Sequence, residues 1–355
     1  MSIRTTFASL LVLSFCLHGL AIAEPKEPQR TGRIEFQPAA NEDQLPELFR
    51  LNPHEFDFRQ APLETVSTSM AIYEVTFPSP VETPHANNNT VHAEYYRPLT
   101  DGKHPAVVVL HILGGDFNLS RLFARQLAGN GVAALFIKLP YYGPRRQPGV
   151  DARMVSTDPR QTVQGMRQAV LDIRRGAAWL AAQSEVDAQQ LGVFGISLGG
   201  ITGALAATAE PRFANICLML AGGDVAQVSW SSSKLARLRE QWLGQGGTRE
   251  EFFELLKPID PVTYGENVRG RRILMLNASH DEIIPRACTE SLWRAFGQPE
   301  IVWMDAGHYS AMRFIFDGLS RVTKFFNGSA ELKASPAAPE KPSQLQPVQE
   351  QPPVE

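Results

Sequence analysis

Short apolar runs alternate along this chain with longer segments in which apolar residues recur every three or four positions. A run of four to eight apolar residues between turn residues is typical of a buried strand. The helical period is clearest over residues 161–182, where the apolar side chains share one helix face. Strands that alternate with helices predict an α/β fold with a mostly parallel central sheet and helices on both faces. The predicted strands are 71–77, 90–96, 105–110, 132–138, 190–194, 271–278 and 300–304.

The ends of the chain differ in composition from its middle. Residues 1–23 combine Arg4, an apolar stretch and an Ala-x-Ala pattern, which predicts a cleaved signal peptide and export to the periplasm or the extracellular space. Residues 24–68 are polar and rich in proline and predict an irregular extension. Residues 331–355 are rich in Pro, Glu and Gln, which predicts a disordered tail. One folded domain over 69–328 remains.

Composition and charge narrow the class of protein. The chain has 355 residues, of which 43% are hydrophobic, enough for one large core. Its formal net charge is −3 and no basic stripe interleaved with aromatic residues occurs, so we expect no nucleic-acid partner. After the leader, no apolar run is long enough to span a membrane and no residue cluster has metal-ligand spacing. Cys217 and Cys288 then remain, and we expect buried free thiols rather than a disulfide.

Residues 195–200, which read Gly-Ile-Ser-Leu-Gly-Gly, carry the strongest chemical signal. Ser197 stands between two glycines, at the junction of an apolar run and a helix of small residues. This context predicts a nucleophile elbow, a sharp turn that exposes the hydroxyl above the sheet. The alternative is a glycine-rich helix start in which the serine is only a capping residue.

A serine nucleophile requires a base and an acid that orients the base. Asp281 follows the predicted strand 271–278, and His308, the one histidine after Asp281, follows strand 300–304. Their order after the serine favours a Ser197–Asp281–His308 triad. Asp224, at the end of an earlier strand, is the alternative acid, whereas the adjacent Glu282 is expected to point away.

Backbone amides that meet the charge on a substrate carbonyl oxygen form an oxyanion hole. The first candidate donor is Leu198, directly after the nucleophile. The second is either Ile112 or Leu113, because the loop after strand 105–110 reads His-Ile-Leu-Gly-Gly and its glycines permit close backbone approach. His111 is expected to shape this loop through local hydrogen bonds and not to act as a base.

Two other segments supply candidates for the substrate pocket. Tyr141 and Tyr142 lie on the loop after strand 132–138, at the same edge of the sheet as the candidate triad. Residues 225–267 are longer than a simple crossover and predict a small helical cap that carries Trp230. For all three aromatic residues, packing is the alternative to substrate contact.

With these motifs in this order, the chain resembles the α/β-hydrolase superfamily over residues 91–327, and more narrowly its dienelactone-hydrolase-like and acetyl-esterase-like serine hydrolases. The resemblance implies an α/β-hydrolase catalytic domain that cleaves carboxylic esters through an acyl-enzyme, without a cofactor or a metal. A small-molecule or saccharide ester is the substrate class it implies. The chain departs from dienelactone hydrolases, which carry cysteine where Ser197 stands, and from hormone-sensitive-lipase-like esterases, whose oxyanion loop is His-Gly-Gly-Gly.

Two other functions are compatible with parts of this sequence pattern. Prolyl-oligopeptidase catalytic domains have the same elbow and the same residue order, although the residues before Ala71 are too few for the propeller of that branch. A hydrolase fold used only for binding is the other alternative. A binding module has no need of a nucleophile, an acid, a base and a glycine-rich oxyanion loop together, which favours the enzyme.

Overall fold

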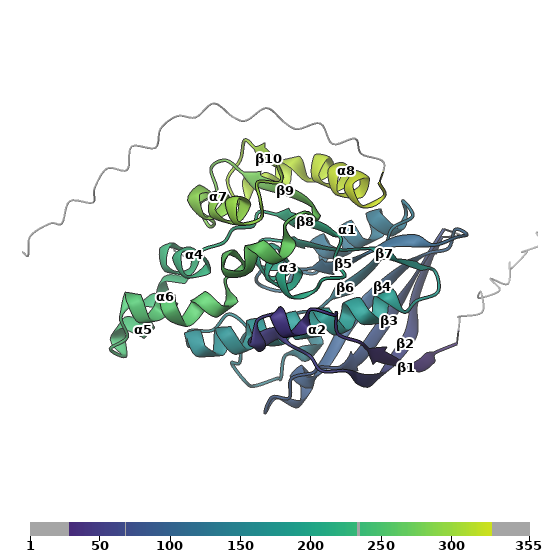
Figure 1. Cartoon of the computed structure of the whole chain (residues 1–355), viewed down its shortest axis with the longest axis horizontal. Coiled ribbons are helices and arrows are strands. Elements are labelled where there is room, and N and C mark those ends of the chain that lie inside the picture. The colour runs from purple at the N-terminus through teal and green to yellow at the C-terminus, as the bar shows by residue number, and fades with distance from the viewer. Residues whose placement is uncertain (1–27, 68, 233–234, 329–355) are drawn as a thin grey trace, which may run out of the picture.

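The computed structural model describes residues 28–67, 69–232 and 235–328, and a single ten-stranded sheet runs through the molecule (Figure 1). The predicted signal peptide and tail lie outside the described residues. The strands are β1 (Arg30–Phe36), β2 (His54–Ser67), β3 (Met70–Pro78), β4 (Thr90–Pro98), β5 (His104–Leu110), β6 (Ala133–Ile137), β7 (Val186–Ile196), β8 (Asn215–Met219), β9 (Arg272–Ala278) and β10 (Glu300–Met304). The α-helices are α1 (Asn118–Ala128), α2 (Pro159–Ala181), α3 (Leu198–Ala209), α4 (Val225–Ser231), α5 (Ala236–Gly244), α6 (Arg249–Leu256), α7 (Arg286–Ala295) and α8 (Ile315–Phe326).

The sheet is mixed, whereas the sequence predicted a mostly parallel one. Its order is β1-β2-β3-β4-β6-β5-β7-β8-β9-β10. The pairs from β6 to β10 along this order are parallel, and the pairs from β1 to β6 are antiparallel. The physical reason lies in the connections. Short links join β2, β3 and β4, and these can only reverse the chain, whereas helical crossovers bring the later strands back in the same direction.

The predicted irregular extension over 24–68 is wrong for much of its length, because it contains β1 and β2. These two strands pair along seven residues each and extend the sheet at one edge. In β1, Ile34 and Phe36 are buried while Arg33 and Glu35 are exposed. The same alternation buries Phe56 and Phe58 in β2. A period of two residues marks a strand with one covered face, and the prolines around it obscured that pattern.

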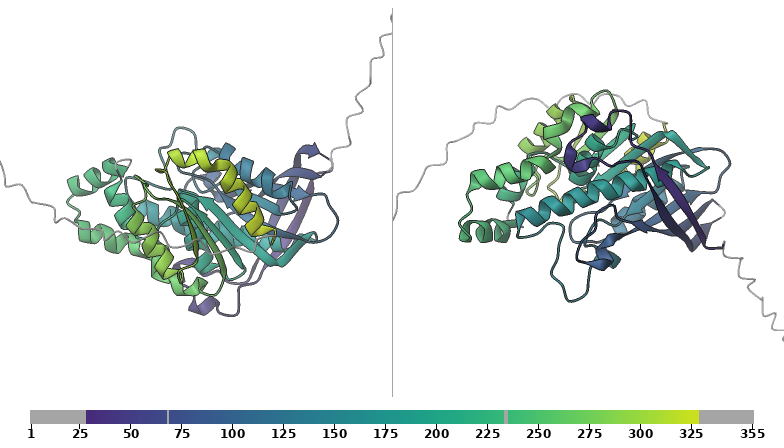
Figure 2. Two further views of the ribbon diagram at one scale, coloured as in Figure 1. Left: turned by 90° about the horizontal axis from the view of Figure 1, so that it is seen from above. Right: turned by 60° about the horizontal axis from the view of Figure 1, so that its bottom comes forward.

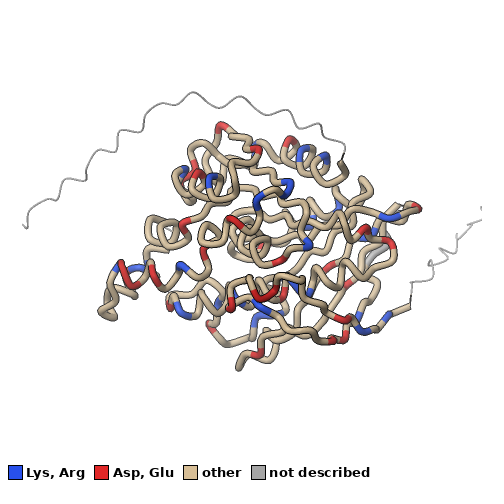
Figure 3. The backbone as a smooth tube through the Cα atoms, viewed as in Figure 1, with Lys and Arg blue, Asp and Glu red and all other residues tan. Residues whose placement is uncertain are grey.

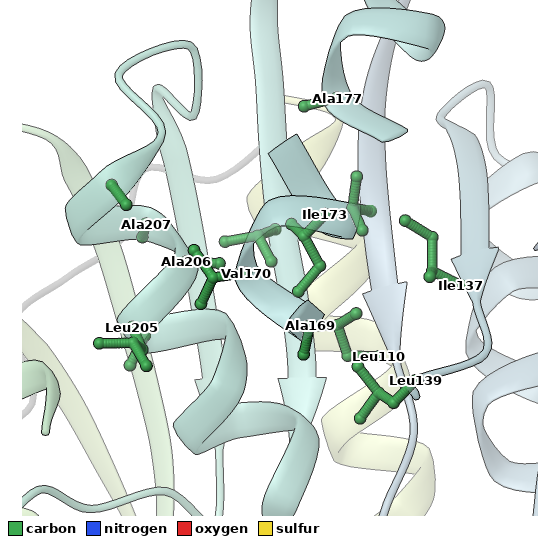
Figure 4. Close-up of a cluster of buried hydrophobic side chains, with 14 of the residues drawn as sticks. Leu110, Ile137, Leu139, Ala169, Val170, Ile173, Ala177, Leu205, Ala206 and Ala207 are labelled. Atoms are coloured by element: carbon green, nitrogen blue, oxygen red, sulfur yellow. The ribbon is translucent and has the colours of Figure 1, made fainter. Parts of the chain in front are cut away.

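Helices cover both faces of the sheet, as the sequence predicted (Figure 2). Helices α2 and α3 pack on one face, and α1 and α8 pack on the other, so two separate hydrophobic clusters form. The predicted amphipathic helix over 161–182 is confirmed as α2. Figure 4 shows Ala169 and Ala177 of α2 in the same buried cluster as Ala206 and Ala207 of α3. Small side chains here let the two helices lie near the strands that carry the candidate site.

The described part of segment 225–267 is mostly helical, as predicted, and contains α4, α5 and α6, followed by the 3₁₀ turns Lys257–Ile259 and Pro261–Val268. In Figure 1 these helices project from the left of the sheet, beyond α3. Acidic and basic residues are interspersed over the described part of the backbone in Figure 3. The absence of a nucleic-acid partner stays a prediction, with which this mixture of charges is compatible.

Candidate active site

Ser197 occupies the predicted sharp turn between β7 and α3. Its backbone has φ 55° and ψ −115°, a conformation that a residue with a Cβ rarely adopts. The turn is held because the Ser197 N–H donates to the Met219 carbonyl at 2.9 Å. A Cβ on Gly199 would lie 2.7 Å from the carbonyl oxygens of Leu110 and His111, which explains the glycine at that position. The local sequence therefore folds as a strand, a strained turn and a helix, with the serine at the apex.

Three side chains from distant parts of the chain form a hydrogen-bonded row at the carboxyl ends of the parallel strands. The Ser197 hydroxyl lies 2.9 Å from Nε2 of His308. Nδ1 of His308 lies 2.8 Å from Oδ2 of Asp281. With a proton on Nδ1, the imidazole donates to Asp281 and accepts the serine proton at Nε2. Both the His308 and Asp281 side chains are largely shielded from solvent.

The Asp281 carboxylate is itself fixed by the loop that follows β9. Its Oδ1 accepts hydrogen bonds from the backbone N–H groups of Ile283 at 2.9 Å and Ile284 at 2.7 Å. Its other oxygen, Oδ2, is thereby left for His308. An acceptor held in this way can select the imidazole tautomer.

The other two carboxylates considered from the sequence have different partners. Asp224 precedes α4 in a left-handed backbone conformation, and its N–H donates to the Asp260 carboxylate at 3.2 Å. Glu282 was expected to point away, and this is wrong, because its Oε2 accepts the backbone N–H of His308 at 2.8 Å. The carboxylate within hydrogen-bond distance of the His308 ring is that of Asp281.

The candidate oxyanion donors belong to two segments that adjoin the elbow. Leu198 is the first residue of α3, and amides in the first turn of a helix have no acceptor within the helix. The loop with Ile112 and Leu113 leaves β5 where Gly199 touches the Leu110 and His111 backbone, so it adjoins the elbow. Gly114 and Gly115 continue the loop with φ of 94° and 76°, which requires glycine. Ile112 and Leu113 both remain candidates for the second donor.

His111 is buried beneath this loop and links it to the loop after β6. Its Nδ1 lies 2.8 Å from the Ile112 carbonyl, and its Nε2 accepts the Leu139 N–H at 3.1 Å. These partners fix a neutral ring with the proton on Nδ1. Burial lowers the pKa of His111 to about 4. Both nitrogens are thus used in holding loops together, in keeping with the structural role expected for this residue.

The depressed pKa of His111 predicts a pH-dependent loss of stability. Between its ordinary value of 6.5 and about 4, the unfolded chain binds a proton that the folded chain does not. The free energy of unfolding should therefore fall by on the order of 3 kcal/mol as the pH drops through this window, and this contribution should be constant below it. Urea unfolding at pH 7 and pH 4 measures the change in wild type and in His111→Asn, which retains a donor toward Ile112.

Comparing the loss of unfolding free energy in wild type with that in His111→Asn isolates His111, because the other histidines contribute equally to both proteins. His54 and His92 also have lowered pKa values, caused first by burial. An equal loss of unfolding free energy in wild type and in His111→Asn would contradict the assignment.

The three aromatic pocket candidates have different surroundings. The Tyr141 ring is buried with its centroid 5.8 Å from that of His85. Trp230 packs in the helical segment with a centroid distance of 5.2 Å to Phe252. The Tyr142 ring contacts the candidate oxyanion loop, with its centroid 4.6 Å from that of His111. Burial raises the pKa of Tyr142 to about 12, so its hydroxyl is neutral. Each of the three rings has packing partners within the protein, and their contact with a substrate stays a prediction.

Several general expectations can be compared with the described residues. Cys217 and Cys288 are both buried free thiols, as predicted. Within the described ranges, no helix has the length and apolar character needed to cross a membrane. Among the same residues, no group of three or more His, Cys, Asp or Glu side chains is arranged to hold a metal ion.

Comparison with known proteins gives matches on both halves of the domain. The model of the prolyl oligopeptidase family matches residues 165–331, and that of alpha/beta hydrolase domain containing 18 matches residues 60–233. An uncharacterized protein of Mycobacterium tuberculosis (strain CDC 1551 / Oshkosh) is 32% identical over 177 residues, which are 48% of this chain and 40% of the relative. The chain thus spans about two fifths of the length of that curated relative.

Solved structures share the fold at low sequence identity. An acetyl xylan esterase from Paenibacillus sp. R4 superposes with a TM-score of 0.61 and 21% identity, over 80% of this chain and 90% of that one. Acetyl xylan esterase 1 from Thermoanaerobacterium sp. JW/SL YS485 superposes with a TM-score of 0.58 and 18% identity, over 80% and 96%. With its strand order, its elbow and these matches, the chain belongs to the α/β-hydrolase superfamily.

Proposed function

We propose that this protein is an exported serine hydrolase that cleaves carboxylic esters. The observation that carries the proposal is the row of hydrogen bonds from Ser197 through His308 to Asp281, with heavy-atom distances of 2.9 and 2.8 Å. A nucleophile, a base and an orienting acid within hydrogen-bond reach are the elements that acyl transfer to water requires.

The mechanism follows from the protonation states that these contacts favour. Ser197 attacks the ester carbonyl while Nε2 of His308 takes its proton, and the resulting imidazolium is stabilised by Asp281. The Leu198 amide and that of Ile112 or Leu113 donate to the oxyanion. His308 then protonates the leaving alcohol. Water, activated by the same imidazole, releases the acid from the acyl-enzyme and restores the serine.

The alcohol and acyl preferences depend on pocket shape and not on the triad. The structural neighbours named acetyl xylan esterases support a small-molecule or saccharide ester as the substrate class. The test is a panel of p-nitrophenyl esters of increasing acyl length, with acetylated xylan and a peptide amide beside them. We expect hydrolysis of at least one ester. Turnover of the amide alone would contradict the ester proposal.

A serine peptidase or amidase is the second candidate, because the prolyl oligopeptidase family model matches residues 165–331. This segment contains Ser197, Asp281 and His308, so the same residues would act on an amide. The amide arm of the panel separates the two candidates. A fluorophosphonate label separates both from a binding module, since only an activated serine reacts.

The proposed export predicts that the mature protein begins at Glu24, and the tail composition predicts that residues after about Ala330 are dispensable. Neither segment belongs to the described residues. Truncation after Ala330 should leave kcat/KM for a short ester unchanged, because the tail contains no triad residue and too few apolar residues to offset ordering entropy. N-terminal sequencing of exported protein and kinetics of the truncated form test the two parts. An intact leader on exported protein, or a large loss of activity, would contradict them.

A further inference from the structure

Two adjacent acidic residues on the loop after β9 contact His308 at two different points. Oδ2 of Asp281 lies 2.8 Å from Nδ1 of the ring. Oε2 of Glu282 accepts the backbone N–H of the same histidine, also at 2.8 Å. One carboxylate therefore holds the imidazole and its neighbour holds the backbone that carries it. The loops after β9 and β10 are joined at the site through these two contacts.

We propose that Glu282 is a positioning residue for the reaction, which keeps the His308 backbone where the imidazole can reach Ser197. The inference rests on the proposed function, because it assigns Glu282 a part in the same proton transfer. Asp281 alone fixes the ring at one nitrogen, and the ring can still swing if the backbone of its loop shifts. Displacement of about 1 Å from the reactive geometry can cost as much as 100-fold in rate.

Gly307 supplies a second observation for the same contact. A Cβ at this position would collide with Oε2 of Glu282, so the carboxylate occupies space that only glycine leaves open. The Gly307 N–H donates to the Ser310 hydroxyl at 2.9 Å, and its carbonyl accepts from Ala311 at 3.0 Å. The loop is thus shaped to admit the Glu282 side chain from the neighbouring strand's loop.

The same two loops carry a matched control pair, His280 and Asp305. Nε2 of His280 lies 3.0 Å from Oδ1 of Asp305, and both side chains are mostly exposed. This pair joins the loops after β9 and β10 as the Glu282 contact does, but no hydrogen bond connects it to His308. An effect found for Glu282 and absent for Asp305 therefore belongs to the contact with His308 and not to loop association in general.

The first experiment compares Glu282→Ala, Glu282→Gln and Asp305→Ala with wild type for hydrolysis of the best ester and for the rate of fluorophosphonate labelling. Asp305→Ala removes the acceptor of His280, as Glu282→Ala removes that of the His308 N–H. Glu282→Ala should lower kcat about tenfold or more, with KM within about twofold. Glu282→Gln should stay within about threefold of wild type, because its amide oxygen still accepts the His308 N–H. Asp305→Ala should stay within about twofold of wild type. Circular dichroism and thermal unfolding check the fold of each variant.

A double-mutant cycle of Gly307→Ala and Glu282→Ala tests whether Gly307 is needed to make room for the Glu282 carboxylate. The added methyl should displace the carboxylate and lower kcat by an amount similar to Glu282→Ala. In the double variant the clash is gone, so the two losses should not multiply and the combined loss should stay close to that of one change. Multiplication of the two losses would show that Gly307 and Glu282 act independently, and would overturn the inference.

The remaining outcomes separate this inference from the proposed function. Wild-type kcat and labelling rate in Glu282→Ala, with Ser197→Ala inactive, would overturn the role of Glu282 and leave the ester hydrolase standing. Equal losses in Glu282→Ala and Glu282→Gln would also overturn it, since the retained acceptor should rescue activity. Absence of ester turnover and of labelling in wild type itself would count against the proposed function.

Discussion

Ser197→Ala should abolish ester hydrolysis, with a loss in kcat of about 10³-fold or more. The hydroxyl supplies the attacking oxygen and makes the one side-chain contact with Nε2 of His308, at 2.9 Å. Its removal costs little packing, because the turn is held by backbone hydrogen bonds to Met219 and Ile201. The variant should therefore keep the melting temperature of wild type. The measurement is kcat on the best ester of the panel, together with thermal unfolding.

A matched serine elsewhere on the surface gives the control. Ser184 is exposed in a turn before β7, where its hydroxyl contacts Glu185, and Ser184→Ala should retain wild-type kcat. The fluorophosphonate label should attach to wild type and to this control but not to Ser197→Ala. Residual activity of Ser197→Ala within about tenfold of wild type would eliminate Ser197 as the nucleophile.

Asp281→Asn should lower kcat by on the order of 10⁴-fold. The reason is that the two carboxylate oxygens have different hydrogen-bond partners. Oδ1 accepts from the Ile283 and Ile284 amides, so an asparagine at 281 would place its carbonyl oxygen there and turn its NH₂ toward His308. Two donors would then face each other, and the imidazole would move its proton to Nε2. In that tautomer it can no longer accept the proton of Ser197.

Asp224→Asn is the comparison that decides between the two acids proposed from the sequence. Asp224 meets Asp260 through its backbone N–H, and its substitution should change kcat by no more than a few fold. The two variants are compared in kcat, KM and melting temperature on the same ester. The reverse ranking, with Asp224→Asn strongly impaired and Asp281→Asn mildly impaired, would move the orienting acid to Asp224.

The parts of the fold that could be predicted are those with a strong local signal. The apolar runs at β5, β6 and β9 gave strands at nearly the observed bounds, because a buried parallel strand leaves a continuous hydrophobic stretch. The period of three and four residues gave α2. The first two strands were missed, because short alternating segments between prolines resemble irregular chain until their partner strand is known.

In the candidate site, too, some features had a local sequence signal and others did not. Order along the chain and position after a strand pointed to Ser197, Asp281 and His308, because catalytic groups of open α/β sheets collect at the carboxyl ends of the strands. The direction of a side chain on a loop follows from its tertiary neighbours. Glu282 was for this reason misplaced: nothing local indicates that its carboxylate reaches the backbone of a residue 26 positions later.

By itself, the sequence determined the α/β architecture, the elbow around Ser197 and the identity of the residues available for a triad. These depend on periodicity, on glycine and on spacing, which are local properties of the chain. Only the tertiary structure decided that the sheet is mixed, that His111 links two loops, and that Asp281 and Glu282 hold His308 at ring and backbone. The physical reason is that hydrogen bonds between loops act over distances of about 3 Å, and folding alone brings such distant residues that close.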